Sequence, residues 1–284
     1  MTLPTPCDLN ETYGAATVHF ECNVSYYLYW KVWPVGADTQ GVGARTLAEC
    51  GVVELRRYTL NHGTRDRLLD VFERRLIEAQ EEAEMVVAGL FADRDDPDAF
   101  VWFRGFADMG SRRAALHAFY DGPVWAEHRD TANATMIDSD NVLLLRPTDP
   151  QHSPPVPSGP RPARHSPPTS PTWVIVTTYL HDDDRGLEEW LSTEVHALLE
   201  TALCTTVAAW RTEPSENTFP ALPVRGEHAF VWSASFVDEQ AYLEARARLE
   251  TNPSWLSQVE PRLKVVLRGR EHHRLQPTAR SHVQ

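Results

Sequence analysis

Two stretches of this sequence are near copies of each other. Residues 99–108 read Ala-Phe-Val-Trp-Phe-Arg-Gly-Phe-Ala-Asp, and residues 229–238 read Ala-Phe-Val-Trp-Ser-Ala-Ser-Phe-Val-Asp. The offset of 130 continues without a gap to residues 123–125 and 253–255, where Pro-x-Trp recurs, so that nine of 27 aligned positions are identical. Unrelated sequences of ordinary composition would share about two. The chain therefore contains two copies of one module.

Each copy predicts the same order of elements: strand, helix, strand, strand, helix, strand. The elements are expected at 52–58, 65–80, 85–91, 99–108, 112–120 and 141–146 in the first copy, and at 173–179, 186–202, 205–211, 229–238, 241–249 and 264–268 in the second. In both copies the third strand ends at an Asp suited to cap the next helix. The order βαββαβ is the ferredoxin-like split unit, which places the chain in the α+β class.

Two such units can bury each other. A ferredoxin-like sheet carries helices on one face and leaves the other bare, so two copies can press their bare faces together and close a barrel. Ten of the 21 prolines lie between Pro147 and Pro171, which predicts a linker there. The expected organisation is an N-terminal extension at 1–50, a first module at 51–147, a proline-rich linker at 148–171, a second module at 172–275 and a polar tail at 276–284.

Composition excludes several classes of function. The formal charge of -13 argues against binding to a phosphate backbone, and hence against a nucleic-acid partner. No apolar run reaches the roughly 18 residues of a membrane span, and the N-terminus lacks the pattern of a signal peptide, so a cytoplasmic location is expected. The four cysteines show no metal-ligand spacing, and no metal site is predicted. The aromatic stretch at 24–33 is read as part of a poorly ordered extension, with a strand or a partner contact as the alternative.

Several runs in the first copy resemble the NIPSNAP family, which belongs to the dimeric α/β-barrel superfamily. They are Val53-Glu54-Leu55-Arg56-Arg57-Tyr58-Thr59-Leu60, the segment 100–106, Ala118-Phe119-Tyr120-Asp121-Gly122-Pro123-Val124-Trp125, His128-Arg129 and Asn141-Val142-Leu143-Leu144-Leu145-Arg146-Pro147. The resemblance covers about residues 51–147, and the second copy is similar in layout but more divergent. It implies an intramolecular version of a barrel that single-module relatives build from two subunits, while a further homo-oligomer is left open.

The same resemblance says less about activity. The superfamily includes cofactor-independent monooxygenases that form quinones, haem-degrading oxygenases, haem peroxidases and decarboxylases, and small isomerases or cyclases. NIPSNAP proteins themselves are mostly uncharacterised, and animal members are associated with mitochondria and protein partners. A shared fold does not fix a function, so the function has to be argued from the site.

The second copy serves as an internal control for the first. At several positions the first copy carries a charge where the second has a small or apolar residue: Glu54 aligns with Ile175, Arg56 with Thr177, Arg104 with Ala234, His128 with Gln258 and Arg129 with Val259, while Tyr58 keeps its tyrosine in Tyr179. In a strand, residues 54, 56 and 58 share one face. We therefore predict a polar pocket in the first module formed by Glu54, Arg56, Tyr58, Arg104, His128 and Arg129, with walls of Trp102, Phe106 and Trp125.

The predicted chemistry follows from these residue types. His128 can exchange a proton near neutral pH, and Tyr58 or Arg129 can hold a developing oxyanion. The surplus of arginine over carboxylate suits an anionic or enolic ligand. The competing interpretation is that Glu54 and its arginines form a structural ion pair inside the barrel, because buried charges are normally paired.

The sequence thus predicts a small-molecule enzyme without a nucleotide cofactor, of monooxygenase, isomerase or cyclase type. Its expected partner is a hydrophobic ligand, aromatic or polyketide-like, as in secondary metabolism. The alternatives are a non-catalytic binding or scaffold protein, and a haem-binding protein with His128 as axial ligand.

Overall fold

The computed structural model describes residues 47–149, 161–164, 166 and 170–283. The aromatic stretch predicted at 24–33 lies outside the described residues. No helix among those described is both long and apolar enough to cross a membrane.

The first module comprises four strands and the helices between them. Its strands are β1 (Val52–Leu60), β2 (Val86–Asp93), β3 (Ala99–Phe106) and β4 (Met136–Pro147), and its helices are α1 (Arg65–Val71), α2 (Ile77–Glu82), α3 (Met109–Tyr120) and α4 (Pro123–Asn133). A π-helical turn at Phe72–Leu76 joins α1 to α2, and a short 3-10 turn at Leu47–Glu49 precedes β1.

The second module repeats this order. Its strands are β5 (Trp173–His181), β6 (Val207–Thr212), β7 (His228–Phe236) and β8 (Leu267–Pro277), and its helices are α5 (Arg185–Trp190), α6 (His196–Leu203), α7 (Glu239–Glu250) and α8 (Glu260–Val266). π-helical turns at Leu191–Val195 and Trp255–Val259 join α5 to α6 and lead into α8.

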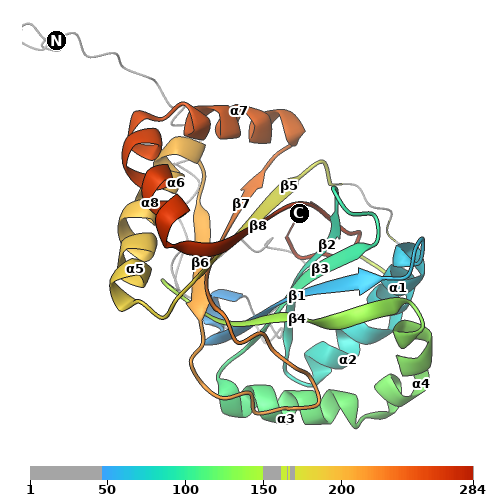
Figure 1. Ribbon diagram of the computed structural model, residues 1–284. Helices are drawn as coiled ribbons and strands as arrows, with labels where there is room; N and C mark the ends of the chain where they lie inside the picture. The colour runs from blue at the N-terminus through green and yellow to red at the C-terminus, as the bar shows by residue number, and fades with distance from the viewer. Residues whose placement is uncertain (1–46, 150–160, 165, 167–169, 284) are drawn as a thin grey trace, which may run out of the picture. The chain divides into compact units, whose positions relative to one another are not determined.

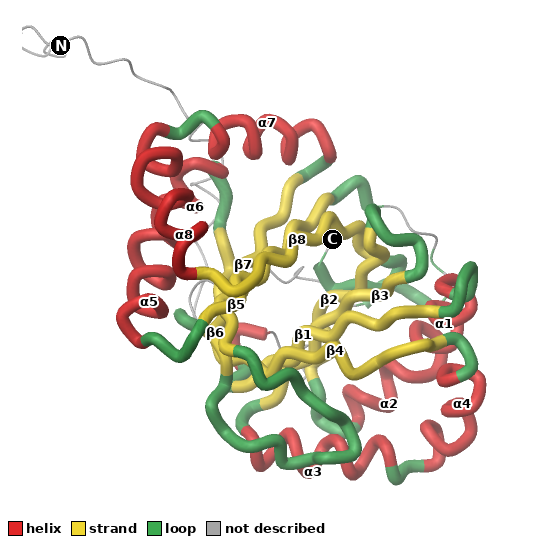
Figure 2. The backbone as a smooth tube through the Cα atoms, in the orientation of Figure 1, coloured by secondary structure: helices red, strands yellow, loops and turns green. Residues whose placement is uncertain are grey.

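The eight strands form one closed barrel in the order β1-β3-β2-β8-β5-β7-β6-β4. Within each half all pairings are antiparallel, and the halves are joined at two seams, where β2 pairs with β8 and β4 pairs with β6. Figures 1 and 2 show the strands at the centre, with the helices of each module gathered on the outer side of that module's own strands. The predicted fold, two ferredoxin-like modules that close a barrel, is confirmed.

The repeated stretch places equivalent caps in both halves. Asp108 accepts a hydrogen bond from the backbone N–H of Ser111 at the start of α3, and Asp238 accepts one from Ala241 at the start of α7. Each carboxylate satisfies a backbone donor that the first helical turn leaves unpaired. The Asp that ends each repeated strand is therefore the start signal of the next helix, as predicted.

Alternate residues of the strands divide between two environments. Val53, Leu55 and Phe103 point into the barrel, where Phe103 meets Trp210 with ring centroids 5.4 Å apart. The cavity described inside the barrel is only about 10 Å³. The barrel interior is thus a packed core, and any larger cavity has to lie between a sheet and its helices.

The end of the chain departs from the prediction. A closing strand was expected at 264–268 and a polar tail at 276–284, but α8 continues to Val266, and β8 runs from Leu267 to Pro277. Beyond it, the backbone N–H groups of Thr278 and His282 donate to the carbonyl oxygens of Leu90 and Ala88 in β2, and Thr278 and His282 are buried. The prediction was wrong because it took a polar composition to mean solvent exposure, whereas the seam between the modules buries these side chains.

Candidate functional site

The charged residues of the first module form a tight ionic cluster. Glu54 Oε2 accepts from Arg104 Nε (2.7 Å) and from Arg56 Nη1 (2.8 Å), and Glu54 Oε1 accepts from Arg112 Nε (2.7 Å). Glu54 and Arg104 are fully buried and Arg56 is 1% exposed. Burial alone would raise the pKa of Glu54, but the charges of Arg104, Arg56 and Arg112 hold this pKa well below its usual range. The carboxylate is therefore permanently ionised at neutral pH.

Tyrosines complete this cluster. Arg56 Nε donates to the hydroxyl of Tyr58 (3.2 Å), and Arg104 Nη1 reaches the hydroxyl of Tyr120 (3.4 Å). The guanidinium of Arg104 also lies 5.2 Å from the ring centre of Trp102 and 5.6 Å from that of Phe106. The structure thus brings together six of the nine predicted site residues: Glu54, Arg56, Tyr58, Arg104, Trp102 and Phe106.

The cluster is not inside the barrel. Trp102 and Phe106 belong to the core between the first module's sheet and its helices, whereas Val53 and Leu55, on the opposite face of β1, line the barrel. The competing interpretation of an ion pair inside the barrel is therefore wrong in its location. It is right that Glu54 is ion-paired with Arg56, Arg104 and Arg112, although Nη2 of Arg104 and Nη2 of Arg112 are buried without a hydrogen-bond partner.

The other three predicted residues lie on α4, where Trp125 reaches the edge of the cluster at Tyr120. Trp125 packs against Phe119 and Tyr120, with ring centroids 5.7 and 5.1 Å apart. The side chain of Arg129 is 58% exposed and reaches Asp130, and His128 is partly buried with Glu127 as its charged neighbour at 3.7 Å. The structure shows no contact between these residues and Glu54, and their predicted catalytic role stays a prediction.

A loop from the second module covers the first module's cluster. Within residues 213–227, which join β6 to β7, Asn217 Oδ1 accepts from Arg112 Nη1 (2.9 Å), and Phe219 lies on Tyr120 with ring centroids 5.8 Å apart. Figure 1 shows this loop crossing to run beside α3. Phe219 is buried in the first module's core. The loop therefore closes the first module's sheet-to-helix space from outside.

The second module has a cavity of about 730 Å³ in the corresponding place. It lies between the sheet β8-β5-β7-β6 and the helices α7 and α8. The reason is visible in the aligned positions: Ile175, Thr177 and Ala234 stand where the first module has Glu54, Arg56 and Arg104. Shorter side chains leave the space that the ionic cluster fills in the first module, and the volume is in the range of ordinary small-molecule sites.

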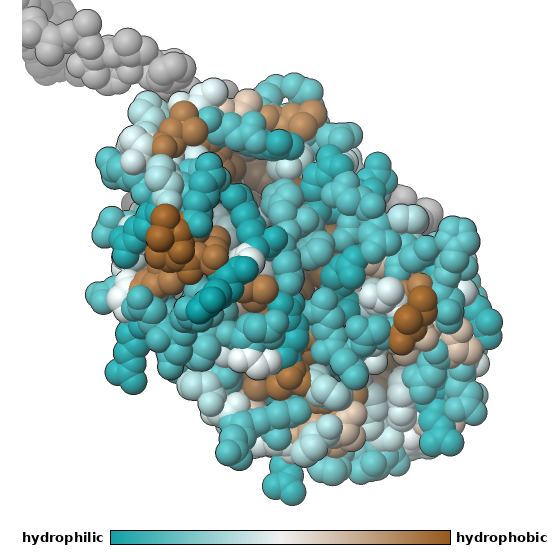
Figure 3. All heavy atoms as spheres, viewed as in Figure 1, coloured by the Kyte–Doolittle hydropathy of each residue, from teal (hydrophilic) through white to brown (hydrophobic). Residues whose placement is uncertain are grey.

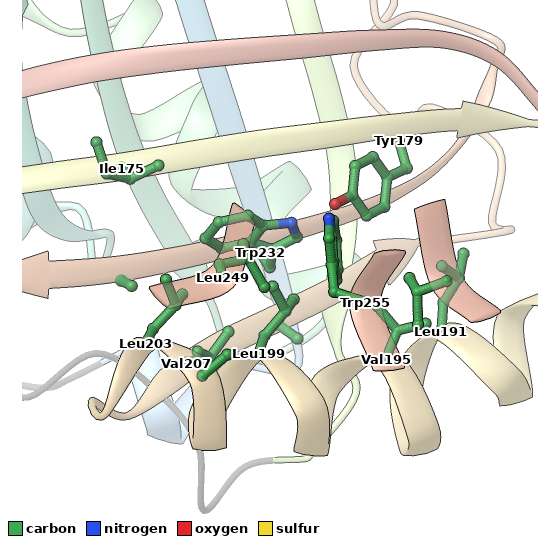
Figure 4. Close-up of a cluster of buried hydrophobic side chains, with 14 of the residues drawn as sticks. Ile175, Tyr179, Leu191, Val195, Leu199, Leu203, Val207, Trp232, Leu249 and Trp255 are labelled. Atoms are coloured by element: carbon green, nitrogen blue, oxygen red, sulfur yellow. The ribbon is translucent and has the colours of Figure 1, made fainter. Parts of the chain in front are cut away.

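The walls of this cavity are mainly apolar and aromatic. They are formed by Ile175, Leu203, Trp232, Phe236, Tyr242, Leu249, Trp255 and Leu256. Figure 4 shows Trp232, Trp255 and Leu249 between the strands and the helices that bear Leu199 and Leu203. Such walls suit a flat hydrophobic ligand.

His272 lies on β8 at the solvent-exposed side of this wall, beside the buried Tyr242. Its Nδ1 lies 2.9 Å from Thr177 Oγ1 and its Nε2 lies 3.5 Å from the hydroxyl of Tyr242. In β8, His272 pairs with Thr177 in the ladder, so both side chains point to the helices. Burial, together with the nearby charge of Arg270, lowers the pKa of His272 to about 4. The imidazole is therefore neutral at neutral pH.

Charged residues surround the cavity with a surplus of positive charge. Its lining contains four cationic side chains, Arg246, Lys264, Arg270 and Arg274, but only the two carboxylates of Glu250 and Glu260. Arg246 is paired with Glu250 (2.7 Å), and Arg270 shares Glu260 with Lys264 at 3.5 and 3.9 Å. Arg274 is paired with Asp95 of the first module. An anionic group of a ligand would meet a favourable potential here.

The hydrophobicity of the surface adds no competing site. On the face in Figure 3 the apolar patches are small and separated by hydrophilic side chains, one of them beside α8. Large exposed apolar residues are scattered, with Val265 the most exposed at 84%. Single exposed apolar side chains of this kind are ordinary.

Sequence reasoning missed His272 because the closing strand was expected at 264–268, which ends before this residue. The signal was available: the offset of 130 continues into the closing strand, where Val142 and Leu144 align with His272 and Arg274. Arg112 was missed as well, and the same offset aligns it with Tyr242. Both pairs are places where the two copies differ in polarity.

The described residues offer no obvious metal centre, since no group of three or more His, Cys, Asp or Glu side chains converges among them. His128, the predicted axial ligand for haem, lies beside Glu127 in the first module and does not line the second module's cavity. The residues around His272 supply one imidazole with aromatic walls.

Comparison with known proteins agrees with this description. Residues 53–150 match the NIPSNAP family model. A candidate monooxygenase from Fusobacterium nucleatum is 10% identical, with a TM-score of 0.51 over 80% of this chain and 92% of that one. An anthrone oxidase-like protein is 11% identical, with a TM-score of 0.50 over 81% and 93%. At these identities the likeness shows the shared barrel fold alone.

One more solved structure is similar over a single module. An uncharacterised NIPSNAP-like domain protein from Burkholderia xenovorans is 25% identical over 39% of this chain and 95% of that one, with a TM-score of 0.34. No curated protein matches the chain. The match to the NIPSNAP family model thus falls on the first module.

Proposed function

We propose that the cavity of the second module binds a flat, hydrophobic, oxygen-bearing small molecule and that His272 removes a proton from it, as the first step of an oxygenation that uses no metal or nucleotide cofactor. The observation that carries this proposal is a neutral imidazole set in the wall of a 730 Å³ cavity with aromatic sides. The predicted substrate class, aromatic or polyketide-like, is retained, but the site moves from the first module to the second.

The geometry of His272 favours proton acceptance. In the tautomer in which Nδ1–H donates to Thr177, Nε2 presents a lone pair on the side of Tyr242. A ligand whose acidic C–H or O–H lies within about 3 Å of Nε2 would transfer its proton there. The surrounding arginines, Arg246 and Arg270 among them, would stabilise the anion left on the ligand.

The reaction balances with dioxygen as the sole co-substrate. A methylene group flanked by aromatic rings loses one proton to His272, and the resulting carbanion adds dioxygen to form a carbon–oxygen bond. The peroxide anion recovers that proton to give a hydroperoxide, which loses water as its remaining C–H bond breaks and a carbonyl forms. The sum is CH₂ + O₂ → C=O + H₂O. An aromatic ring system stabilises the carbanion, which is why this substrate class needs no cofactor. The fold shared with a candidate monooxygenase and with an anthrone oxidase-like protein supports this reaction type.

Anthrone is a suitable probe, because its methylene is oxidised to the second carbonyl of anthraquinone. We expect the protein to accelerate oxygen uptake and quinone formation above the buffer background, and His272→Gln to lower kcat/KM by about 10²–10³. Because His272 has a pKa of about 4, kcat/KM should rise between pH 3 and 5 and stay level above that.

His273→Gln is the matched control. His273 is the next residue on β8 but faces the barrel, where its Nδ1 lies 3.1 Å from Asp93 Oδ2. The His273→Gln variant should retain turnover within about twofold of the wild type if the site is where we propose. Equal rates in the His272 variant and the wild type would contradict the proposal, and anthrone binding without turnover would favour the non-catalytic alternative. For the haem alternative, a Soret shift with haemin that disappears in His128→Ala would be the supporting result.

A further inference from the structure

The rim of the second module's cavity carries accessible positive charge, whereas its inner walls are apolar. The wall residues Ile175, Trp232 and Trp255 are buried. By contrast, the side chain of Lys264 on α8 is 72% exposed and that of Arg270 on β8 is 40% exposed, and both belong to the cavity lining. A ligand in this cavity therefore meets apolar walls on the inside and solvated cations at the rim.

Lys264 and Arg270 share a single carboxylate. Glu260 Oε1 lies 3.9 Å from Lys264 Nζ, and Glu260 Oε2 lies 3.5 Å from Arg270 Nη1. Direct charge-assisted hydrogen bonds between such groups are shorter, about 2.7–2.9 Å. One carboxylate thus contacts two cations loosely. This leaves one positive charge uncompensated, together with N–H donors that a second carboxylate could use.

The other two cations of the lining have carboxylates of their own. Arg246 Nε lies 2.7 Å from Glu250 Oε1 on the same helix. Arg274 is paired with Asp95 of the first module. The uncompensated charge is therefore that of the two cations around Glu260.

The first module has no cation at the corresponding places. At the offset of 130, Ala134 takes the place of Lys264 and Asp140 takes that of Arg270. The first module's arginines lie instead beneath its helices, where they are paired with the buried Glu54. Cations at the rim thus occur in the module that has the cavity, which is expected if they serve its ligand.

We infer that Lys264 and Arg270 form an anion-binding subsite at the rim that holds the carboxylate of an aromatic acid, whose rings lie between the aromatic walls of the cavity. The inference rests on the proposed function and adds the substrate class: a fused aromatic ring system that carries a carboxylate. Together with Glu260, the ligand then balances two cations with two carboxylates. A carboxylate at the rim keeps part of its hydration, so this pairing costs little desolvation. Lys264 and Arg270 are binding residues, and the proton-accepting group remains His272.

A matched pair of ligands tests the subsite without turnover. 2-Naphthoate and 2-naphthamide share one planar frame, but only naphthoate is negatively charged at neutral pH. Titration calorimetry of the full-length protein at low salt should give about tenfold tighter binding of naphthoate. At about 1 M salt the preference should fall to threefold or less, because the rim is exposed and its charges are screened.

Variants at the rim should change this preference in both directions. In the double variant Lys264→Gln with Arg270→Gln, the preference should fall below about twofold while naphthamide affinity stays unchanged. Glu260→Gln removes the resident carboxylate and frees both cations, so naphthoate should bind about threefold more tightly than to the wild type. A gain of affinity on removing Glu260 is not expected if these residues only support the fold.

Arg268→Gln is the control variant. Arg268 is two residues from Arg270 on β8, so its substitution removes the same charge from the same strand. It is paired with Asp182 at 2.8 Å and does not line the cavity. Arg268→Gln should keep the tenfold preference, and a loss of the preference here would show a general attraction by the surface and overturn the subsite.

The remaining outcomes separate this inference from the proposed function. Equal binding of both ligands by the wild type, or a preference that survives in the double variant, overturns the subsite and leaves the cavity and His272 standing. Binding of neither ligand, with anthrone turnover that depends on His272, also overturns the subsite alone. Binding of neither ligand without anthrone turnover overturns both. A preference lost in the double variant, kept in Arg268→Gln and increased in Glu260→Gln establishes the subsite.

Discussion

The two modules have the same order and arrangement of elements, but they differ in what occupies the space between sheet and helices. In the first, Glu54 and three arginines fill this space with a buried ionic cluster. In the second, Ile175 and Ala234 take the places of Glu54 and Arg104, and a cavity of about 730 Å³ remains. Large paired side chains on neighbouring strands thus fill the space in the first module. Shorter side chains at the same positions leave the space open in the second.

The modules also differ in what they place over each other. The second module's loop 213–227 is long enough to place Phe219 against Tyr120, at the end of α3 in the first module. The first module's corresponding turn, between Asp93 and Ala99, is short and meets the second module along β8, where Asp95 pairs with Arg274, Asp93 with His273, and Arg94 with Gln276. One module is thus covered by its neighbour, while the other keeps an opening.

The largest effect is expected from breaking the ionic cluster. Glu54→Gln keeps the shape of the side chain but leaves Arg56, Arg104 and Arg112 buried without their shared carboxylate. The free energy of unfolding should fall by about 3–5 kcal/mol in urea denaturation. The equivalent change in the second module, Ile175→Val, should cost only about 1 kcal/mol. A loss below 1 kcal/mol for Glu54→Gln would mean that the cluster does not hold the first module together.

An intermediate effect is expected from making the second module resemble the first. Ala234 is buried on β7, opposite Ile175 in the ladder, at the position of Arg104. Ala234→Leu should project into the cavity and weaken anthrone binding by about 1–2 kcal/mol, or roughly fivefold to thirtyfold. Ala99→Val, on β3 of the first module, gives a comparable increase in volume away from the cavity and should leave the affinity unchanged. Unaltered binding by Ala234→Leu would place the ligand elsewhere.

The smallest effect is expected from acid. The pKa of His272 is lowered from 6.5 to about 4, so the unfolded chain binds its proton before the folded one does. The stabilisation is therefore fully present above about pH 6.5 and is lost as the pH falls toward 4. Because the ring is partly solvated, the loss of unfolding free energy between pH 7 and 5.5 should be small, less than the full pKa shift would give.

His272→Gln should flatten the dependence of the unfolding free energy on pH in this range. In the first module, Glu54 gives a pH dependence in a different range. The pKa of Glu54 is lowered, so its contribution is lost only as the pH falls below about 4.5, the range where the unfolded carboxylate takes up its proton. Urea midpoints measured every half unit from pH 7 to 4.5 separate the two. A profile of His272→Gln that parallels the wild type would show that the imidazole is solvated.

Much of the fold could be read from the sequence because its signals are local. The repeat at 99–108 and 229–238 identified two modules, the alternation of apolar residues gave the strands, and the Asp at the end of each repeated strand marked the next helix. The faces of β1 were also correct, since Glu54, Arg56 and Tyr58 do share one side. Each of these features depends only on neighbours within a few residues along the chain.

The site could be predicted only in part, because its contacts join distant segments. The pocket predicted from the charge differences included Glu54, Arg56 and Arg104, but Arg112 lies 58 residues from Glu54 on a helix and was not foreseen. His272 lies beyond the closing strand expected at 264–268, although its ladder partner Thr177 places it in the cavity wall. Apolar periodicity does not tell which face of a sheet remains open.

By itself, the sequence determined that the chain contains two copies of a βαββαβ module and that the copies have diverged in charge. Tertiary structure alone decided what this divergence means: the charged copy is filled and covered, and the less charged copy is hollow. The physical reason is that composition reports the charges of side chains, whereas burial, register and the crossing loop 213–227 decide whether those charges neutralise one another or line an open space.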